Sequence, residues 1–150
     1  MNRFMIVVNP DKDTDSTVTN RIQSYLEAHG AACMVRDVFH LESSDWEALK
    51  KEQFDCVLVL GGDGTLLRMA GETEDIDIPL FGINLGTVGF LTEGEVANIE
   101  EILDRLLTDD FTIEERMMVT GTVTKADGTT YRKSALNDIV ISRAGFSRLI

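Results

Sequence analysis

Cysteine and histidine are both scarce in this sequence, with two residues of each type. Cys33 and Cys56 lack the C-x-x-C spacing of redox and zinc motifs, and both fall in segments that we predict to be buried strands. We therefore expect two packed thiols rather than a disulfide or a metal-binding pair. Because His29 and His40 form no ligand cluster either, we assign no residue to a metal site.

Long apolar runs and dense basic patches are also missing. No run approaches the length that spans a bilayer, and the first residues lack the long apolar region of a signal peptide, so we expect a cytoplasmic protein. The formal net charge of -12 at pH 7 repels nucleic-acid backbones and anionic membrane surfaces. We therefore expect neither nucleic acid nor membrane as a partner, and the composition favours small molecules.

Apolar residues are nevertheless plentiful, at 43% of the 150 residues, which suffices for the core of one soluble domain with a small appendage. Apolar runs of strand length alternate with amphipathic helical stretches. The predicted strands cover residues 4–8, 31–35 and 56–60, with a helix from about Ser16 to Gly30 and a second one opened by a Ser44 and Glu47 capping box. This order predicts a doubly wound α/β fold with a mostly parallel sheet.

The pattern continues to about residue 110 and then changes. A fourth strand is predicted at residues 80–84, followed by an amphipathic helix from Glu95. Beyond it the apolar period becomes two, and strands are predicted at residues 118–124, 129–135 and 138–142, with an Asp127-Gly128 hairpin turn. We expect an α/β domain at 1–110 and, at 111–150, the first strands of an incomplete antiparallel β domain whose open edge favours association.

A glycine-rich segment, Gly61-Gly62-Asp63-Gly64-Thr65, stands between the strand at 56–60 and a helix-like stretch. The glycines allow backbone N–H groups to approach an anion, the start of the helix adds a favourable dipole, and Asp63 contributes a carboxylate. The chain has neither a Walker loop nor G-x-G-x-x-G, so this is a different kind of phosphate-binding loop. This segment, the first glycine loop, predicts phosphoryl chemistry.

A second glycine loop follows the predicted fourth strand and has the sequence Gly86-Thr87-Val88-Gly89-Phe90. Ligands in open α/β sheets bind beyond the carboxyl ends of the strands. We therefore expect both glycine loops to face one crevice.

The chain resembles the NAD kinase family in three segments that occur in the family's order: the first glycine loop, the string from Gly82 to Leu91, and Leu136-Asn137-Asp138. The resemblance covers essentially the whole chain and implies an amino-terminal α/β nucleotide-binding domain followed by the first strands of a β-rich domain. It also implies transfer of a phosphoryl group to the adenosine 2'-hydroxyl of NAD. The implied donor is ATP or polyphosphate, Mg2+ is the implied cofactor, and the parent protein is expected to be a homo-oligomer.

The resemblance also assigns roles to individual residues. Asp63 is similar to the family's proton acceptor for the 2'-hydroxyl, although a carboxylate also suits a metal ion, and both roles stay open. The positions that match the family at the nucleotide are Gly61, Gly62, Gly64, Thr65, Arg68, Asn84, Phe90, Asn137, Asp138 and Arg148. Phe90 matches a residue that borders the adenine, and Arg148 a position that is often basic or His.

One family segment has no counterpart, the Thr-Pro-x-Gly-Ser/Thr-type string downstream of the Asn-acid pair. Without it the dinucleotide site lacks one wall, so we expect the amino-terminal part of an NAD kinase, with little or no turnover alone. Two alternatives stay open: a non-catalytic nucleotide-binding or oligomerisation module, and a lipid kinase of the diacylglycerol kinase type. A lipid kinase would resemble Gly-Thr-Gly-Asn-Asp in the second loop, which this chain does not.

Overall fold

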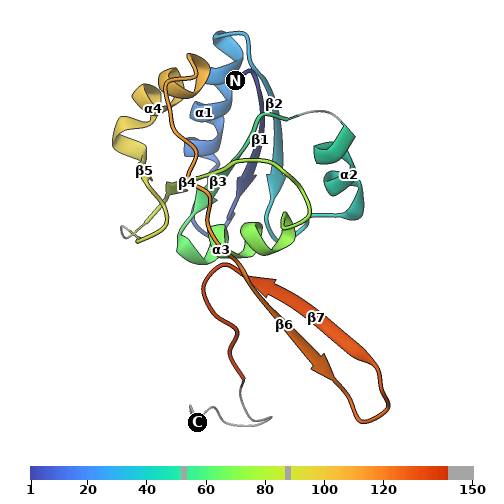
Figure 1. The fold of residues 1–150 in the computed structure, drawn as a ribbon. Helices are drawn as coiled ribbons and strands as arrows, with labels where there is room; N and C mark the ends of the chain where they lie inside the picture. Colours follow the sequence, from blue (N-terminus) through green and yellow to red (C-terminus); the bar gives the residue numbers. More distant parts are fainter. Residues whose placement is uncertain (52–53, 87–88, 142–150) are drawn as a thin grey trace. The chain divides into compact units, whose positions relative to one another are not determined.

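The computed structural model describes residues 1–51, 54–86 and 89–141, and the chain divides into two units. The first unit is Met1–Glu114 and the second begins at Glu115. The first unit is an α/β fold built on a sheet of five strands (Figure 1). These strands are β1 (Arg3–Val8), β2 (Ala32–Asp37), β3 (Cys56–Gly61), β4 (Leu80–Asn84) and β5 (Gly94–Glu95).

All neighbouring strands of this sheet are parallel, in the order β2-β1-β3-β4-β5. The central strand β3 is buried along its whole length, as its continuous apolar run predicts. Alternate side chains of β1 enter two separate cores, with Phe4 and Ile6 on one face of the sheet and Met5 and Val7 on the other. The predicted doubly wound, mostly parallel sheet is confirmed.

Helices cover both faces of the sheet (Figure 1). They are α1 (Thr17–Ala28), α2 (Ser43–Lys51), α3 (Asp63–Glu72), the 3-10 helix η1 (Val96–Asn98) and α4 (Ile99–Leu107). α1 and α4 place Ile22, Leu26 and Leu103 in one core, whereas α2 and α3 place Leu49 and Met69 in the other. In the described parts of the chain, no helix is long and apolar enough to cross a membrane.

The start of α2 differs from the prediction. The helix begins one residue before Ser44, and the predicted capping box is wrong because Glu47 pairs instead with Lys51 at 2.7 Å. The stabilising acceptor of the first turn is Asp45, whose Oδ2 accepts the N–H of Glu42 at 2.9 Å. A short acidic side chain near a helix start can satisfy a backbone donor in the same way as a cap.

Both cysteines are free thiols within the first unit. Cys56 is buried on β3, and burial raises the pKa of its thiol to about 12. Cys33 is half-buried on β2, and burial raises the pKa of its thiol to about 11. The expectation of packed thiols is confirmed.

The second unit contains an antiparallel hairpin of β6 (Val119–Thr124) and β7 (Thr130–Ala135). Its turn contains the predicted Asp127-Gly128 pair, in which Gly128 has φ +85° and Asp127 Oδ1 accepts the N–H of Thr129 at 2.9 Å. The third predicted strand is not formed within residues 138–141, and Ser142 lies outside the described residues. Ile139 instead packs by its side chain against Gly121, where a Cβ would lie 2.8 Å from Ile139 Cδ1.

Candidate functional site

The order of the strands reverses between β1 and β3. From β1 the chain passes through α1 to β2 on one side, and from β3 it passes through α3 to β4 on the other, so the loops diverge at the carboxyl ends of β1 and β3. Asn9 joins the two loops: its N–H donates to the Leu60 carbonyl at 2.8 Å, and its Nδ2 to Thr65 Oγ1 at 3.5 Å. Open α/β sheets bind ligands at such a switch point.

The first glycine loop connects β3 to α3, with Gly62 as the N-cap. A Cβ on Gly61 would lie 2.4 Å from Thr65 Oγ1, so the chain itself fills the space at this glycine. A Cβ on Gly62 or Gly64 would meet nothing within 4 Å. The N-terminus of α3 is therefore open, and its first N–H groups and its dipole favour an anion there.

Asp63, the first residue of α3, directs its carboxylate to residues 90–92, which begin at the last residue of the second glycine loop. Oδ2 accepts the N–H of Phe90 at 2.7 Å. Oδ1 accepts the N–H groups of Leu91 and Thr92 at 3.0 and 3.2 Å, and the Thr92 hydroxyl at 3.3 Å. The two glycine-rich segments, expected to face one crevice, are thus joined by this carboxylate.

These hydrogen bonds determine the acid–base character of Asp63. The N–H of Phe90, followed by that of Leu91, stabilises the carboxylate and holds the pKa of Asp63 below its ordinary value. Asp63 is therefore ionised at neutral pH and is a weak base. Since a carboxylate oxygen has two lone pairs and Oδ2 accepts only the Phe90 N–H among the described contacts, Oδ2 has room for one further donor or a metal ion.

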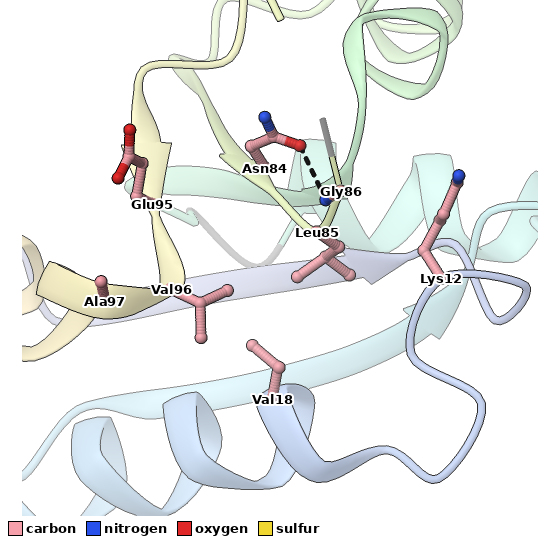
Figure 2. Close-up of a pocket in the computed structure, with 8 residues that line it drawn as sticks. All are labelled: Lys12, Val18, Asn84, Leu85, Gly86, Glu95, Val96 and Ala97. Atoms are coloured by element: carbon pink, nitrogen blue, oxygen red, sulfur yellow. Dashed lines mark hydrogen bonds between the residues drawn. The ribbon is translucent and has the colours of Figure 1, made fainter. Parts of the chain in front are cut away.

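A cavity of about 310 Å³ lies at the ends of β4 and β5 (Figure 2). Asn84 stands on its wall, buried, with Oδ1 accepting the N–H of Gly86 at 2.9 Å. In Figure 2, aliphatic side chains lie together in the middle of the cavity, and Lys12 and Glu95 stand at opposite ends. The lining residues are Lys12, Val18, Asn84, Leu85, Gly86, Glu95, Val96 and Ala97. An apolar cavity with a few polar groups at its ends suits a small organic ligand.

Two further predicted site residues lie at the surface of the first unit. Phe90 is 92% exposed, so its ring is accessible to a ligand. Arg68 is exposed on α3, but its guanidinium lies 5.7 Å from the centroid of the Phe39 ring. The structure therefore places the guanidinium of Arg68 over an aromatic ring, one helical turn after the first glycine loop.

The remaining predicted residues lie beyond the first unit. Asn137 and Asp138 belong to the second unit, where both are exposed after β7. Arg148 lies outside the described residues. Within the first unit, the structure brings together the two glycine-rich segments around Asp63.

Sequence reasoning missed four residues of this region: Asn9, Lys12, Thr92 and Glu95. Asn9 and Lys12 carried a usable signal, because they follow the first predicted strand at the same sheet edge as the glycine loops. No local pattern marked Thr92 as a partner of Asp63. Among the described residues, no group of three or more His, Cys, Asp or Glu gathers that could hold a metal ion.

Known proteins are similar to this chain in sequence. Residues 4–111 match the family described as the ATP-NAD kinase N-terminal domain. An NAD kinase of Lachnoclostridium phytofermentans is 41% identical over 100% of this chain and 54% of that relative. An NAD kinase of Lachnospira eligens is 39% identical over 100% of this chain and 53% of that relative. The chain thus spans about half the length of the curated relatives it matches.

The fold is also similar to that of yeast NADH kinase complexed with NADH, with a TM-score of 0.70 at 14% identity over 91% of this chain and 47% of that chain. At this identity the likeness concerns the fold alone. The family match, by contrast, rests on sequence and extends over more than half of the chain. The chain therefore belongs to the NAD kinase family.

Proposed function

We propose that this chain forms the nucleotide-binding part of an NAD kinase, which transfers a phosphoryl group from ATP or polyphosphate to the adenosine 2'-hydroxyl of NAD. One observation carries the proposal: the open N-terminus of α3 stands directly beside the ionised Asp63 carboxylate. The helix start suits a phosphate group, and the remaining lone pair of Asp63 Oδ2 suits a hydroxyl donor. The site can hold both reacting groups at once.

In this proposal Asp63 orients the attacking hydroxyl. Its lowered pKa makes it a poor base for early deprotonation. Phosphoryl transfer through a loose transition state requires positioning more than a strong base. The hydroxyl oxygen forms the new P–O bond, the bond from the phosphorus to the leaving phosphate breaks, and the hydroxyl proton passes late to Oδ2.

Other residues of the family resemblance receive proposed contacts. The backbone at Gly61, Gly62, Gly64 and Thr65 faces the phosphates, and the exposed ring of Phe90 borders the adenine. Asn84 is proposed to lie near the nucleotide, where its Oδ1 accepts the N–H of Gly86 and so holds the start of the second glycine loop. The proposal retains contacts to the nucleotide by Arg68, Asn137, Asp138 and Arg148, and for Arg68 the contact requires release from the Phe39 ring.

Mg2+, when bound, neutralises phosphate oxygens. Asp63 is the residue that would hold it, because Oδ2 has room for one further partner. A site with one protein carboxylate fits Mg2+, which keeps water and substrate phosphates as its other ligands. The metal ion and the hydroxyl compete for the same oxygen, and the lowered pKa of Asp63 suits both.

The proposal extends to the setting of the protein. We propose cytoplasmic location, homo-oligomeric assembly, no nucleic-acid or membrane partner, and a domain limit near residue 110, with the β domain at 111–150 incomplete. The lengths of the relatives support the last point, since this chain spans about half of each.

Nuclear magnetic resonance on the 15N-labelled chain tests the phosphate site. Tripolyphosphate with Mg2+ is expected to shift the amide signals of Gly62, Asp63 and Gly64 at the start of α3. Shifts elsewhere, with these three unchanged, would contradict the proposal. Asp63→Asn is the companion variant, and it should retain the phosphate response because the backbone donors remain.

A coupled assay with NAD, ATP and Mg2+ tests the expectation of an incomplete site. We expect little or no NADP from the purified chain, and near-normal turnover would refute it. The non-catalytic alternative predicts micromolar NAD binding by calorimetry without any product, whereas an inert fragment binds no NAD.

A further inference from the structure

The Asp63 carboxylate occupies the space where a side chain on Gly89 would lie. A Cβ on Gly89 would lie 2.1 Å from Asp63 Oδ1, 2.6 Å from Cγ and 2.9 Å from Oδ2. Non-bonded heavy atoms do not approach so closely, so any side chain here displaces the carboxylate or the backbone. These distances show that the position of Gly89 requires space.

The three residues after Gly89 close around the same carboxylate. Their consecutive N–H groups, from Phe90, Leu91 and Thr92, all donate to Asp63. Thr92 anchors this segment in the fold: it is buried, and its Cγ2 lies 2.9 Å from the position that a Cβ on Gly82 of β4 would occupy. The segment is therefore fixed to the sheet at one end and to Asp63 along its length.

Asp63 is attached in turn to the rigid part of the fold. It begins α3, which follows the buried central strand β3. Its carboxylate could reach several rotamers from a helix start, and the hydrogen bonds from residues 90–92 select one of them. This selection leaves Oδ2 with the single bond from Phe90 and concentrates the other donors on Oδ1.

We propose that Gly89 is a positioning residue for Asp63: the absence of a side chain allows the N–H groups of residues 90–92 to fix the carboxylate with Oδ2 turned to the reacting hydroxyl. The inference rests on the proposed function for the role of Asp63. The geometric part of the inference is that Gly89 permits only one position of the carboxylate, and it depends on the Cβ distances at Gly89 and on the hydrogen bonds from residues 90–92. Gly89 itself touches no reacting atom in this scheme.

The test compares Gly89→Ala with Gly86→Ala in the 150-residue chain. The control is matched because Gly86 lies in the same loop, has no positive φ, and a Cβ there would meet only Lys12 Nζ at 3.9 Å. A 13C titration of the side-chain carboxyl of Asp63 is recorded for both variants. We expect Gly89→Ala to raise the pKa of Asp63 toward the ordinary value of about 3.9, and Gly86→Ala to leave it at the lowered value. A folded Gly89→Ala chain that titrates like the unmodified chain overturns the proposal.

A second measurement needs no variant and tests the hydrogen bonds on which the proposal depends even where Gly89→Ala fails to fold. In the unmodified chain the amide signals of Phe90, Leu91 and Thr92 should move together at the midpoint of the Asp63 titration, because protonation weakens their shared acceptor. Amides that ignore this midpoint overturn the proposal. Both titrations are recorded without substrate, so they test the role of Gly89 independently of the proposed function. If both give the expected result but tripolyphosphate shifts no amide signal at the start of α3, only the proposed function is refuted.

Discussion

The Gly61→Ala substitution is expected to destabilise the first unit more than its size suggests. The added Cβ would lie 2.4 Å from Thr65 Oγ1, 2.7 Å from Thr65 Cβ and 3.1 Å from Thr65 Cγ2. Rotation of the Thr65 side chain moves Oγ1 and Cγ2 but leaves Cβ in place. The contact at 2.7 Å therefore persists in every rotamer, and the backbone of the first glycine loop or of α3 must shift.

The expected cost follows from overpacking at a buried position. Thr65 is 8% exposed and also receives the bond from Asn9, so little empty space is available for relaxation. Insertion of a methyl group into such a site costs about 1–3 kcal/mol of the free energy of unfolding. With a urea m-value of about 1–3 kcal/mol/M for a small domain, the midpoint of unfolding falls by roughly 1 M.

Urea unfolding followed by the fluorescence of Trp46 measures this effect. Trp46 is the one tryptophan of the chain and packs against the core of the face that α2 and α3 cover, so its signal reports the first unit. Gly64→Ala is the control, because a Cβ there meets nothing within 4 Å and alanine in a helix is about 0.5–1 kcal/mol more favourable than glycine. Equal effects of the two substitutions would refute the packing argument.

Four further outcomes are expected. Below about pH 4, the Asp63→Asn variant should lose less stability than the unmodified chain does. The pKa of Asp63 is lowered in the folded state, so the stabilisation that its carboxylate contributes is complete above the unfolded pKa of about 3.9 and disappears as pH falls through the folded value. Urea unfolding at several pH values measures this difference. Asp45→Ala should cost about 1–3 kcal/mol in the same assay because it removes a buried carboxylate and leaves the part-buried N–H of Glu42 and the part-buried guanidinium of Arg36 without this acceptor. Lys51→Ala, which breaks an exposed pair, should change stability by less than about 0.5 kcal/mol. A thiol reagent at pH 8 should leave Cys56 unmodified and modify Cys33 slowly until urea unfolds the chain; rapid native labelling of Cys56 would show that burial does not protect it. Light scattering should show association through the exposed apolar side chains of the second unit, and a monomer counts against this expectation.

Local sequence patterns predicted most of the first unit. The apolar run at residues 4–8 predicted a strand buried on both faces, and the structure places Phe4 and Met5 in opposite cores. Gly30 was expected to end the first helix, and it follows the C-cap residue His29 with φ +83°, a conformation that glycine adopts without strain. Both signals depend only on residues near each other in the chain.

Features that depend on competing partners or on distant residues were not predictable in the same way. Ser44 and Glu47 satisfied the capping pattern, but Glu47 had a competing partner in Lys51. The run at 138–142 has strand composition, yet within the described residues it packs by Ile139 on the hairpin and forms no ladder. A strand requires a partner edge in register, and no local pattern specifies that edge.

In the candidate site, too, local features were predicted and contacts between distant segments were not. Spacing and glycine content predicted that the two glycine-rich segments lie at one edge of the sheet. The contact between Asp63 and the N–H groups of residues 90–92 required the backbone geometry of a second segment more than twenty positions away. No sequence pattern specifies which lone pair of a carboxylate is already in use.

The position of β3 in the middle of the sheet has a consequence for ligand affinity. Its register pairs it with β1 on one side and β4 on the other, so backbone amides on both edges are engaged right up to the first glycine loop. A loop attached to such a stem is already ordered before any ligand arrives. Little conformational entropy then remains to be lost when an anion docks, and even weak individual contacts can show up as measurable binding.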